Sequence, residues 1–187
     1  MGSLNYMKII GFTGRKRAGK DTAADVLVRE GYELIKFAGA LKAMIRAYLT
    51  YIGVSPQTIE RMIEGDLKEL SYECFVGRTP RFVMQTLGTE WGRDIINTNL
   101  WVNACMRRCS MFDNVVISDC RFPNEVAAIQ EQGGKIICIV RPEPNPSWDD
   151  MHLSETGIDA LPYDHIIVNN STVAALHDKI IEIVKNL

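Results

Sequence analysis

A basic turn near the start of the chain has the composition of a phosphate-binding loop. The segment 11–22 reads GFTGRKRAGKDT and holds four cations and three glycines in twelve residues. Gly14, Gly19 and Lys20 fit the P-loop pattern G-x-x-x-x-G-K-[ST], but Asp21 stands where a hydroxyl is usual. Glycines let the backbone approach phosphate closely, the following helix start adds free N–H groups, and the lysine adds a full charge. The segment therefore predicts a site for the phosphates of a nucleotide.

The carboxylate of Asp21 needs an explanation, because a bare carboxylate beside phosphate would be repelled. It could cap the following helix, since aspartate accepts hydrogen bonds from N–H groups at a helix start. It could instead bind Mg²⁺, in place of the usual hydroxyl or beside it, with Thr22 as the next residue. The residues leave both interpretations open.

The loop carries more cations than one nucleotide requires, namely Arg15, Lys16 and Arg17 beside Lys20. Solvated surface charge is one explanation. The other is a second substrate that bears a phosphate, since fixed cations and Mg²⁺ must offset the repulsion between two phosphates before transfer. A kinase whose acceptor is itself a phosphate explains the loop best.

A second cluster follows the apolar run 114–118 (NVVIS). Asp119 stands directly after this run, where many P-loop proteins carry the acidic residue that holds Mg²⁺ or its water shell. Arg121 could clamp a phosphate through two parallel hydrogen bonds, or it could pair with Glu125. We expect Asp119 and Arg121 to belong to the same site as the loop.

Strand-like and helix-like segments alternate along the chain and must position these residues. The expected strands are 8–13, 32–38, 114–118, 135–140 and 165–168. The expected helices are 22–30, 40–52, 56–64, 81–89, 99–109, 125–132 and 171–187, with 65–80 unassigned. This alternation predicts an α/β three-layer fold with a five-stranded parallel sheet flanked by helices. Ligands bind beyond the carboxyl ends of such strands, so the loop and Asp119 are predicted to meet there.

The bulk properties fit one globular domain. The chain has 187 residues, a formal net charge of −2 and 24% charged residues, which argues against a nucleic-acid polymer as partner. We expect a single domain over 7–187, with a flap at 142–160 that starts in the proline-rich stretch 142–150. Residues 1–6 precede a second methionine and are expected to be a remnant outside the fold.

The remaining composition points to the cytoplasm, or to the host cytoplasm if the source is viral. The five cysteines are an odd number and are expected to be free thiols in a reducing compartment. No apolar stretch approaches the roughly 20 residues that span a bilayer, so no membrane partner is expected. Small molecules are the expected partners, and a homodimer is left open.

Several segments together resemble the deoxynucleoside monophosphate kinases known from phages. The segments that recur in order are GRKRAGKDTAAD, FAGALK, RFVMQTLGTEWGR, LWV, SDCRFPNE and HLSETGI. The resemblance runs from about residue 8 to residue 187, and Gly-Lys-Asp-Thr is itself typical of that family. Phosphomevalonate kinase of animals is a more distant likeness.

The resemblance implies a P-loop kinase fold, ATP as phosphate donor, Mg²⁺ as cofactor, and transfer to a deoxynucleoside monophosphate. It implies that ATP phosphates and magnesium are bound by Gly14, Lys16, Arg17, Gly19, Lys20, Asp21 and Thr22. The implied catalytic residues are Lys20, Arg17, Arg121 and Asp119, and the implied metal ligands are Asp21, Thr22 and Asp119. The acceptor is expected to contact Lys16, Arg17, Arg81, Gln85, Thr89, Trp101 and Arg121.

Some of these assignments have a plainer alternative. Arg81, Gln85 and Thr89 recur every four residues, so they share a helix face that could read a base edge or simply be exposed. Trp101 could stack on a base or be a core tryptophan. Two other functions also remain open on the sequence: a kinase for another small phosphorylated metabolite, and a nucleotide-binding switch without transfer.

Overall fold

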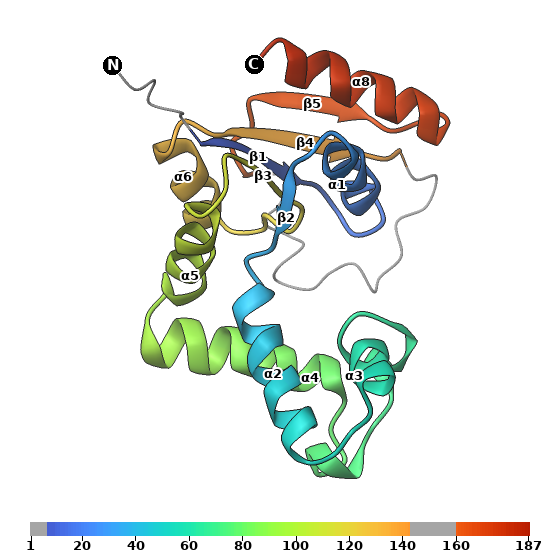
Figure 1. Ribbon diagram of the computed structural model, residues 1–187, viewed down its shortest axis with the longest axis vertical. Helices are drawn as coiled ribbons and strands as arrows, with labels where there is room; N and C mark the ends of the chain where they lie inside the picture. The colour runs from blue at the N-terminus through green and yellow to red at the C-terminus, as the bar shows by residue number, and fades with distance from the viewer. Residues whose placement is uncertain (1–6, 143–159) are drawn as a thin grey trace. The chain divides into compact units, whose positions relative to one another are not determined.

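The computed structural model describes residues 7–142 and 160–187 and shows two compact units (Figure 1). Unit 1 combines the chain up to Phe37 with the chain from Met106 onward, and unit 2 is Ala38–Cys105. The expected flap at 142–160 lies outside the described residues except for its two end positions. In the described part of the chain, no helix is both long enough and apolar enough to cross a bilayer.

Unit 1 is built on a parallel sheet with strand order β2-β3-β1-β4-β5. Its strands are β1 (Lys8–Thr13), β2 (Glu33–Ile35), β3 (Asn114–Ile117), β4 (Lys135–Val140) and β5 (His165–Val168). Strands covered on both faces read as nearly continuous apolar runs, as the central parts of KIIGFT and KIICIV do here. The predicted five-stranded parallel sheet is confirmed, with each strand within three residues of its expected bounds.

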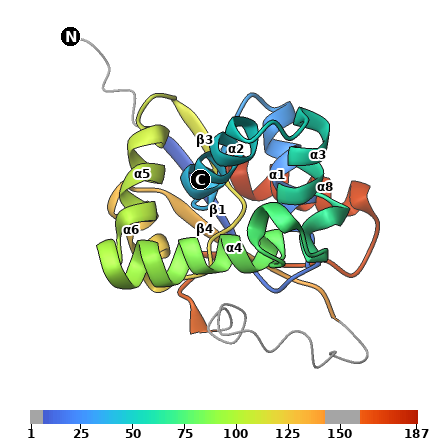
Figure 2. The same ribbon diagram turned by 90° about the horizontal axis from the view of Figure 1, so that it is seen from below.

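Helices cover both faces of this sheet, and the two views agree on their sides (Figures 1 and 2). On one face, α1 (Lys20–Arg29) and α8 (Val173–Lys185) pack over the strands around Phe12, Leu27 and Ile180, each 0% exposed. On the other face lies α6 (Pro123–Glu131), where a Cβ added to Gly11 would lie 2.8 Å from Ile129 Cδ1. The result is the expected three-layer arrangement.

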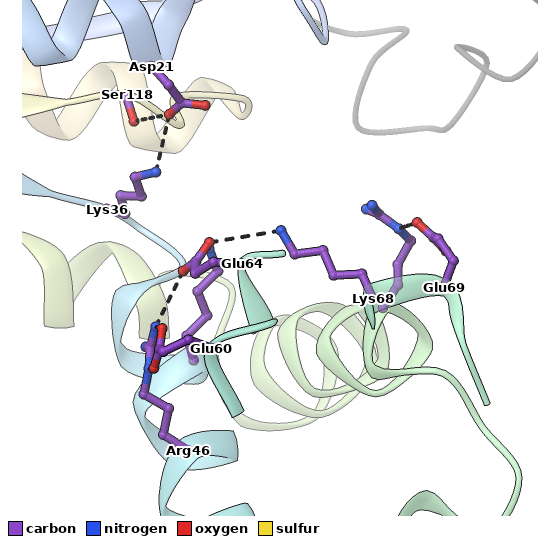
Figure 3. A network of polar contacts seen from close by, with 10 residues as sticks. Asp21, Lys36, Arg46, Glu60, Glu64, Lys68, Glu69 and Ser118 are labelled. Carbon is purple, nitrogen blue, oxygen red and sulfur yellow. Dashed lines mark hydrogen bonds and ion pairs between the residues drawn. The ribbon is translucent and has the colours of Figure 1, made fainter. Parts of the chain in front are cut away.

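Unit 2 is helical and has its own core. Its elements are α2 (Gly39–Tyr51), α3 (Pro56–Ile63), the 3₁₀ turns Asp66–Glu69 and Glu73–Phe75, α4 (Pro80–Thr86) and a π-helix, Leu87–Ile96. Leu49, Met62 and Ile63 are the most buried residues of this core. The next helix, α5 (Leu100–Cys109), runs across the boundary into unit 1. Unit 2 carries ion pairs on its surface. In one of them the Arg46 guanidinium donates to the Glu60 carboxylate (Figure 3).

Several boundaries differ from the expected ones, most of them by no more than three residues, and two differences have a clear physical reason. Helix α1 begins at Lys20 rather than at residue 22, because Gly19 serves as its N-cap. The helix expected over 81–89 continues to Ile96 as a π-helix. The wider turn leaves room for Trp101, whose Nε1 donates to the Gly88 carbonyl at 2.7 Å.

Substitution of Gly92 should test how tightly this π-helix is packed. A Cβ at Gly92 would lie 2.4 Å from Trp101 Nε1, inside any allowed contact distance. We therefore expect Gly92→Ala to lower the free energy of unfolding in urea by about 1–3 kcal/mol. At Gly88 a Cβ would meet only Leu41, at 3.4 Å, so Gly88→Ala is the matched control and should be neutral or slightly stabilising. Equal effects of the two substitutions would contradict this packing.

Candidate active site

The backbone of the loop between β1 and α1 explains why glycines stand where they do. Gly14 has φ +134° and Gly19 has φ +107°, conformations that L side chains rarely adopt. A Cβ on Gly14 would also lie 2.2 Å from the Ile139 carbonyl oxygen. Arg17 adopts φ +63° without being glycine, and such conformations cluster at binding sites.

Lys20 lies over the loop and closes it. Its side chain is 9% exposed, and Nζ donates to the Gly14 carbonyl at 2.6 Å and to the Arg15 carbonyl at 2.7 Å. Within the described residues, the backbone N–H groups of Gly19, Asp21 and Thr22 meet no acceptor. Free N–H groups at a helix N-terminus beside a lysine ammonium form an anion site.

Asp21 does not cap its own helix, so the capping interpretation is wrong. Helix α1 has no side-chain cap, and Asp21 Oδ1 instead accepts from Ser118 Oγ at 3.1 Å and Lys36 Nζ at 3.2 Å (Figure 3). Loss of some hydration in the loop acts to raise the pKa of Asp21, but Lys36 and Ser118 outweigh it, so the pKa lies below its usual 3.8. The carboxylate thus ties the start of α1 to the ends of β2 and β3.

Removal of the Lys36 cation should destabilise the fold in a pH-dependent way. Because the pKa of Asp21 is lowered in the folded state, its stabilisation is present above the unfolded value and is lost as pH falls through the folded pKa. The Asp21 side chain is 81% exposed, and an exposed pair contributes roughly 0.2–1 kcal/mol. Lys36→Met should therefore lower Tm at pH 7 by about 1–3 °C.

Thermal melts from pH 7 to pH 3 measure this effect, and the Tm difference from the unsubstituted protein should shrink below pH 3.8. Lys179→Met is the control, since Lys179 Nζ donates to the Val168 carbonyl, which does not titrate. Its Tm difference should stay constant over the same range. A difference for Lys36→Met that does not change with pH would contradict the pairing with Asp21.

Asp119 is fixed at the end of β3, next to the loop. Its Oδ1 accepts from the Phe37 backbone N–H at 2.9 Å. The following segment is pinned by Glu125, which is 2% exposed and accepts from the backbone N–H groups of Arg121 and Phe122 at 2.7 and 3.1 Å. The sequence left open that Arg121 pairs with Glu125. The two residues do interact, but through the backbone N–H of Arg121. As predicted, the segment around Asp119 and the loop meet, through the contact between Ser118 and Asp21.

The remaining predicted residues belong to unit 2. Arg81 forms an ion pair with Glu69, while Gln85 and Thr89 are exposed. Trp101 is 4% exposed, packs in the core of unit 2 and lies 6.1 Å from Trp91 between ring centroids. This burial favours the second interpretation of Trp101, a core tryptophan, over a plane for stacking on a base.

Three residues at the site were missed by the sequence analysis: Lys36, Ser118 and Asn169. Each stands directly after a parallel strand, namely β2, β3 and β5. Asn169 follows the strand expected at 165–168, so the rule that ligands bind beyond the carboxyl ends of strands, applied to every strand, would have found it. Lys36 and Ser118 fall inside the expected strands 32–38 and 114–118, and only the shorter observed strands place them after a carboxyl end.

Comparisons with known proteins agree with this geometry. A family model described as deoxynucleotide monophosphate kinase matches residues 78–180. A protein of Acanthamoeba polyphaga mimivirus assigned as a deoxynucleotide monophosphate kinase is 34% identical over 96% of this chain and 97% of its own length. The deoxynucleotide monophosphate kinase of Enterobacteria phage T4 is 22% identical over 93% of this chain and 97% of its own.

Solved structures support the fold. Dephospho-CoA kinase from Campylobacter jejuni has a TM-score of 0.50 and 14% identity, covering 96% of this chain and 97% of its own. Shikimate kinase from Aquifex aeolicus has a TM-score of 0.50 and 15% identity, covering 95% and 96%. The fold is therefore that of the P-loop kinases. With the family match and the mimivirus relative, the chain belongs to the deoxynucleotide monophosphate kinase family, and it is an ATP-dependent phosphotransferase whose acceptor is a phosphate group.

Proposed function

We propose that the chain transfers the terminal phosphate of ATP to a deoxynucleoside monophosphate, giving ADP and the diphosphate. The structure of the loop is the observation that carries this proposal. Its N–H groups at Gly19, Asp21 and Thr22 have no acceptor among the described residues, and the Lys20 ammonium lies against the same loop. This is a site for a polyphosphate, and the family supplies the acceptor class.

The donor phosphates are bound by the loop in this proposal. Gly14 and Gly19 allow the close approach of backbone to phosphate, and Lys20 Nζ exchanges its loop carbonyls for phosphate oxygens. Lys16 and Arg17 are exposed at the tip of the loop. They supply the positive charge that brings a second anionic reactant alongside the first.

The donor set of the site fits Mg²⁺. Asp21 engages only Oδ1 with the described residues, which leaves Oδ2 open to a cation or its water, and the Thr22 hydroxyl has no partner among them. Asp119 adds a second carboxylate from the end of β3. Mg²⁺ is commonly held by one or two carboxylates together with substrate phosphates. When bound, it neutralises charge on the donor phosphates; Asp21, Thr22 and Asp119 would hold it.

The transfer needs no general base, because the acceptor phosphate oxygen is already anionic at neutral pH. Catalysis then consists of in-line positioning and stabilisation of charge. We assign this role to Lys20, Arg17 and Arg121. The acceptor nucleoside is assigned to the exposed strip of Gln85 and Thr89 in unit 2, with Arg81 at its start.

A transfer assay tests the proposal directly. ATP, Mg²⁺ and each of the eight common nucleoside monophosphates are incubated with the protein, and ADP and the diphosphate are quantified. We expect diphosphate formation with one or more deoxynucleoside monophosphates. Formation of ADP from ATP without conversion of any acceptor monophosphate to its diphosphate would contradict the proposal.

A further inference from the structure

The first residue after β5 reaches back to the phosphate-binding loop. The Asn169 backbone N–H donates to the Val140 carbonyl at 2.7 Å, which fixes the residue at the carboxyl edge of the sheet. Its side-chain Nδ2 donates to the Ala18 carbonyl at 2.8 Å, across 151 positions of sequence. Because a carbonyl only accepts, the amide nitrogen is the group that must face it.

This hydrogen bond fixes the direction of one peptide group in the loop. The Ala18 carbonyl and the Gly19 N–H belong to the same peptide, and in a trans peptide these groups point in opposite directions. Holding the carbonyl toward Asn169 therefore turns the Gly19 N–H away from it. That N–H is one of those without an acceptor among the described residues.

The loop needs such an outside restraint. Arg17 at φ +63° and Gly19 at φ +107° lie outside the common backbone regions on either side of Ala18, so no helix geometry sets the orientation of this peptide. The Asn169 amide also fits closely, since a Cβ on Gly19 would lie 2.5 Å from Nδ2. Ala18 itself is 2% exposed, which leaves little space for another arrangement.

We propose that Asn169 is a positioning residue for the donor phosphates: it orients the Ala18–Gly19 peptide so that the Gly19 N–H can donate to the nucleotide. The inference rests on the proposed role of the loop as the ATP site. Asn169 is not expected to touch the reacting atoms. Its effect should appear in donor affinity and not in acceptor affinity.

Asn169→Asp tests this, because it keeps the size of the side chain but places a carboxylate oxygen against the Ala18 carbonyl. We expect the Kd for ADP, measured by calorimetry, and the KM for ATP to rise roughly tenfold or more, through a lost hydrogen bond and added repulsion. The KM for the acceptor should stay within about twofold. Asn170→Asp adds the same charge one residue away, at an exposed side chain with no hydrogen bond to the described residues, and should leave all three constants within about twofold.

The outcomes separate this inference from the proposed function. Absence of ADP binding by the unsubstituted protein would overturn both. Equal ADP affinity for Asn169→Asp and the unsubstituted protein would overturn the inference alone, as would a parallel rise in both KM values. If Asn169→Asp shows no cooperative melt, Asn169→Ala carries the same test, with an expected rise in the Kd for ADP of about three- to tenfold.

Discussion

Replacing Lys20 with alanine should reduce kcat by about 10²–10³-fold or more while the protein stays folded. The expectation follows from the position of Nζ, which is nearly buried and lies at hydrogen-bond distance from two carbonyls of the loop. Among the described residues Lys20 is the one buried cation, and it lies against the loop whose Gly19, Asp21 and Thr22 N–H groups meet no acceptor there. Its loss removes charge stabilisation where the transition state needs it and leaves the sheet unchanged.

The measurement is the rate of diphosphate formation at saturating ATP and acceptor, together with Tm. Lys8→Ala is the matched control: Lys8 also donates to a backbone carbonyl of unit 1, that of Val184, but it stands at the amino end of β1, opposite the loop. It should retain near-normal kcat. Near-normal transfer by Lys20→Ala would contradict the assignment of the loop as the catalytic site.

The order of elements in unit 1 could be predicted because buried parallel strands appear in the sequence as short apolar runs. β1 and β4 each contain a short, nearly continuous apolar run, IIGF in β1 and IICIV in β4. The loop was predictable for a similar reason, since the backbone at Gly14 and Gly19 excludes other residues. For the strands the physical cause lies within one local segment. For the two glycines the positive φ is local, while the atoms that a Cβ would meet belong to Ile139 and Asn169.

Contacts that depend on strand order could not be predicted in the same way. β3 lies between β1 and β2, and only this order brings Ser118 to Asp21 and the Phe37 N–H to Asp119. No periodicity within a single strand specifies its neighbours. The hydrogen bond between Asn169 and Ala18 likewise requires β5 to lie beside β4.

The burial of Trp101 was left undecided for a different reason. The 3.6-residue period of an α-helix does not describe 87–96, where the π-helix adds residues to each turn. Gly92 then faces the indole closely enough that a Cβ would overlap it. Two glycines four positions apart, Gly88 and Gly92, were the available signal, and only packing shows that they accommodate a tryptophan.

Asp119 has both a structural and an electrostatic role in this site, and one substitution can separate them. Asparagine keeps the side-chain oxygen that accepts from the Phe37 N–H but removes the negative charge. If the charge holds Mg²⁺ as proposed, Asp119→Asn should lower kcat by about 10²-fold and raise the Mg²⁺ concentration needed for half-maximal rate. Its Tm should stay close to that of the unsubstituted protein, because the hydrogen bond is retained.

Asp119→Ala removes both the charge and the acceptor, so it should show the same loss of kcat and, in addition, a free energy of unfolding lower by about 1–3 kcal/mol. Asp113→Asn makes the same charge change at an exposed residue before β3 and should alter neither kcat nor the Mg²⁺ requirement. Calorimetric titration of ADP with and without Mg²⁺ gives a readout apart from turnover: Mg²⁺ should strengthen ADP binding for the unsubstituted protein more than for Asp119→Asn. If Asp119→Asn keeps the full Mg²⁺ response, the carboxylate serves only to hold the Phe37 backbone at the end of β2, and the metal site must be formed by Asp21 and Thr22.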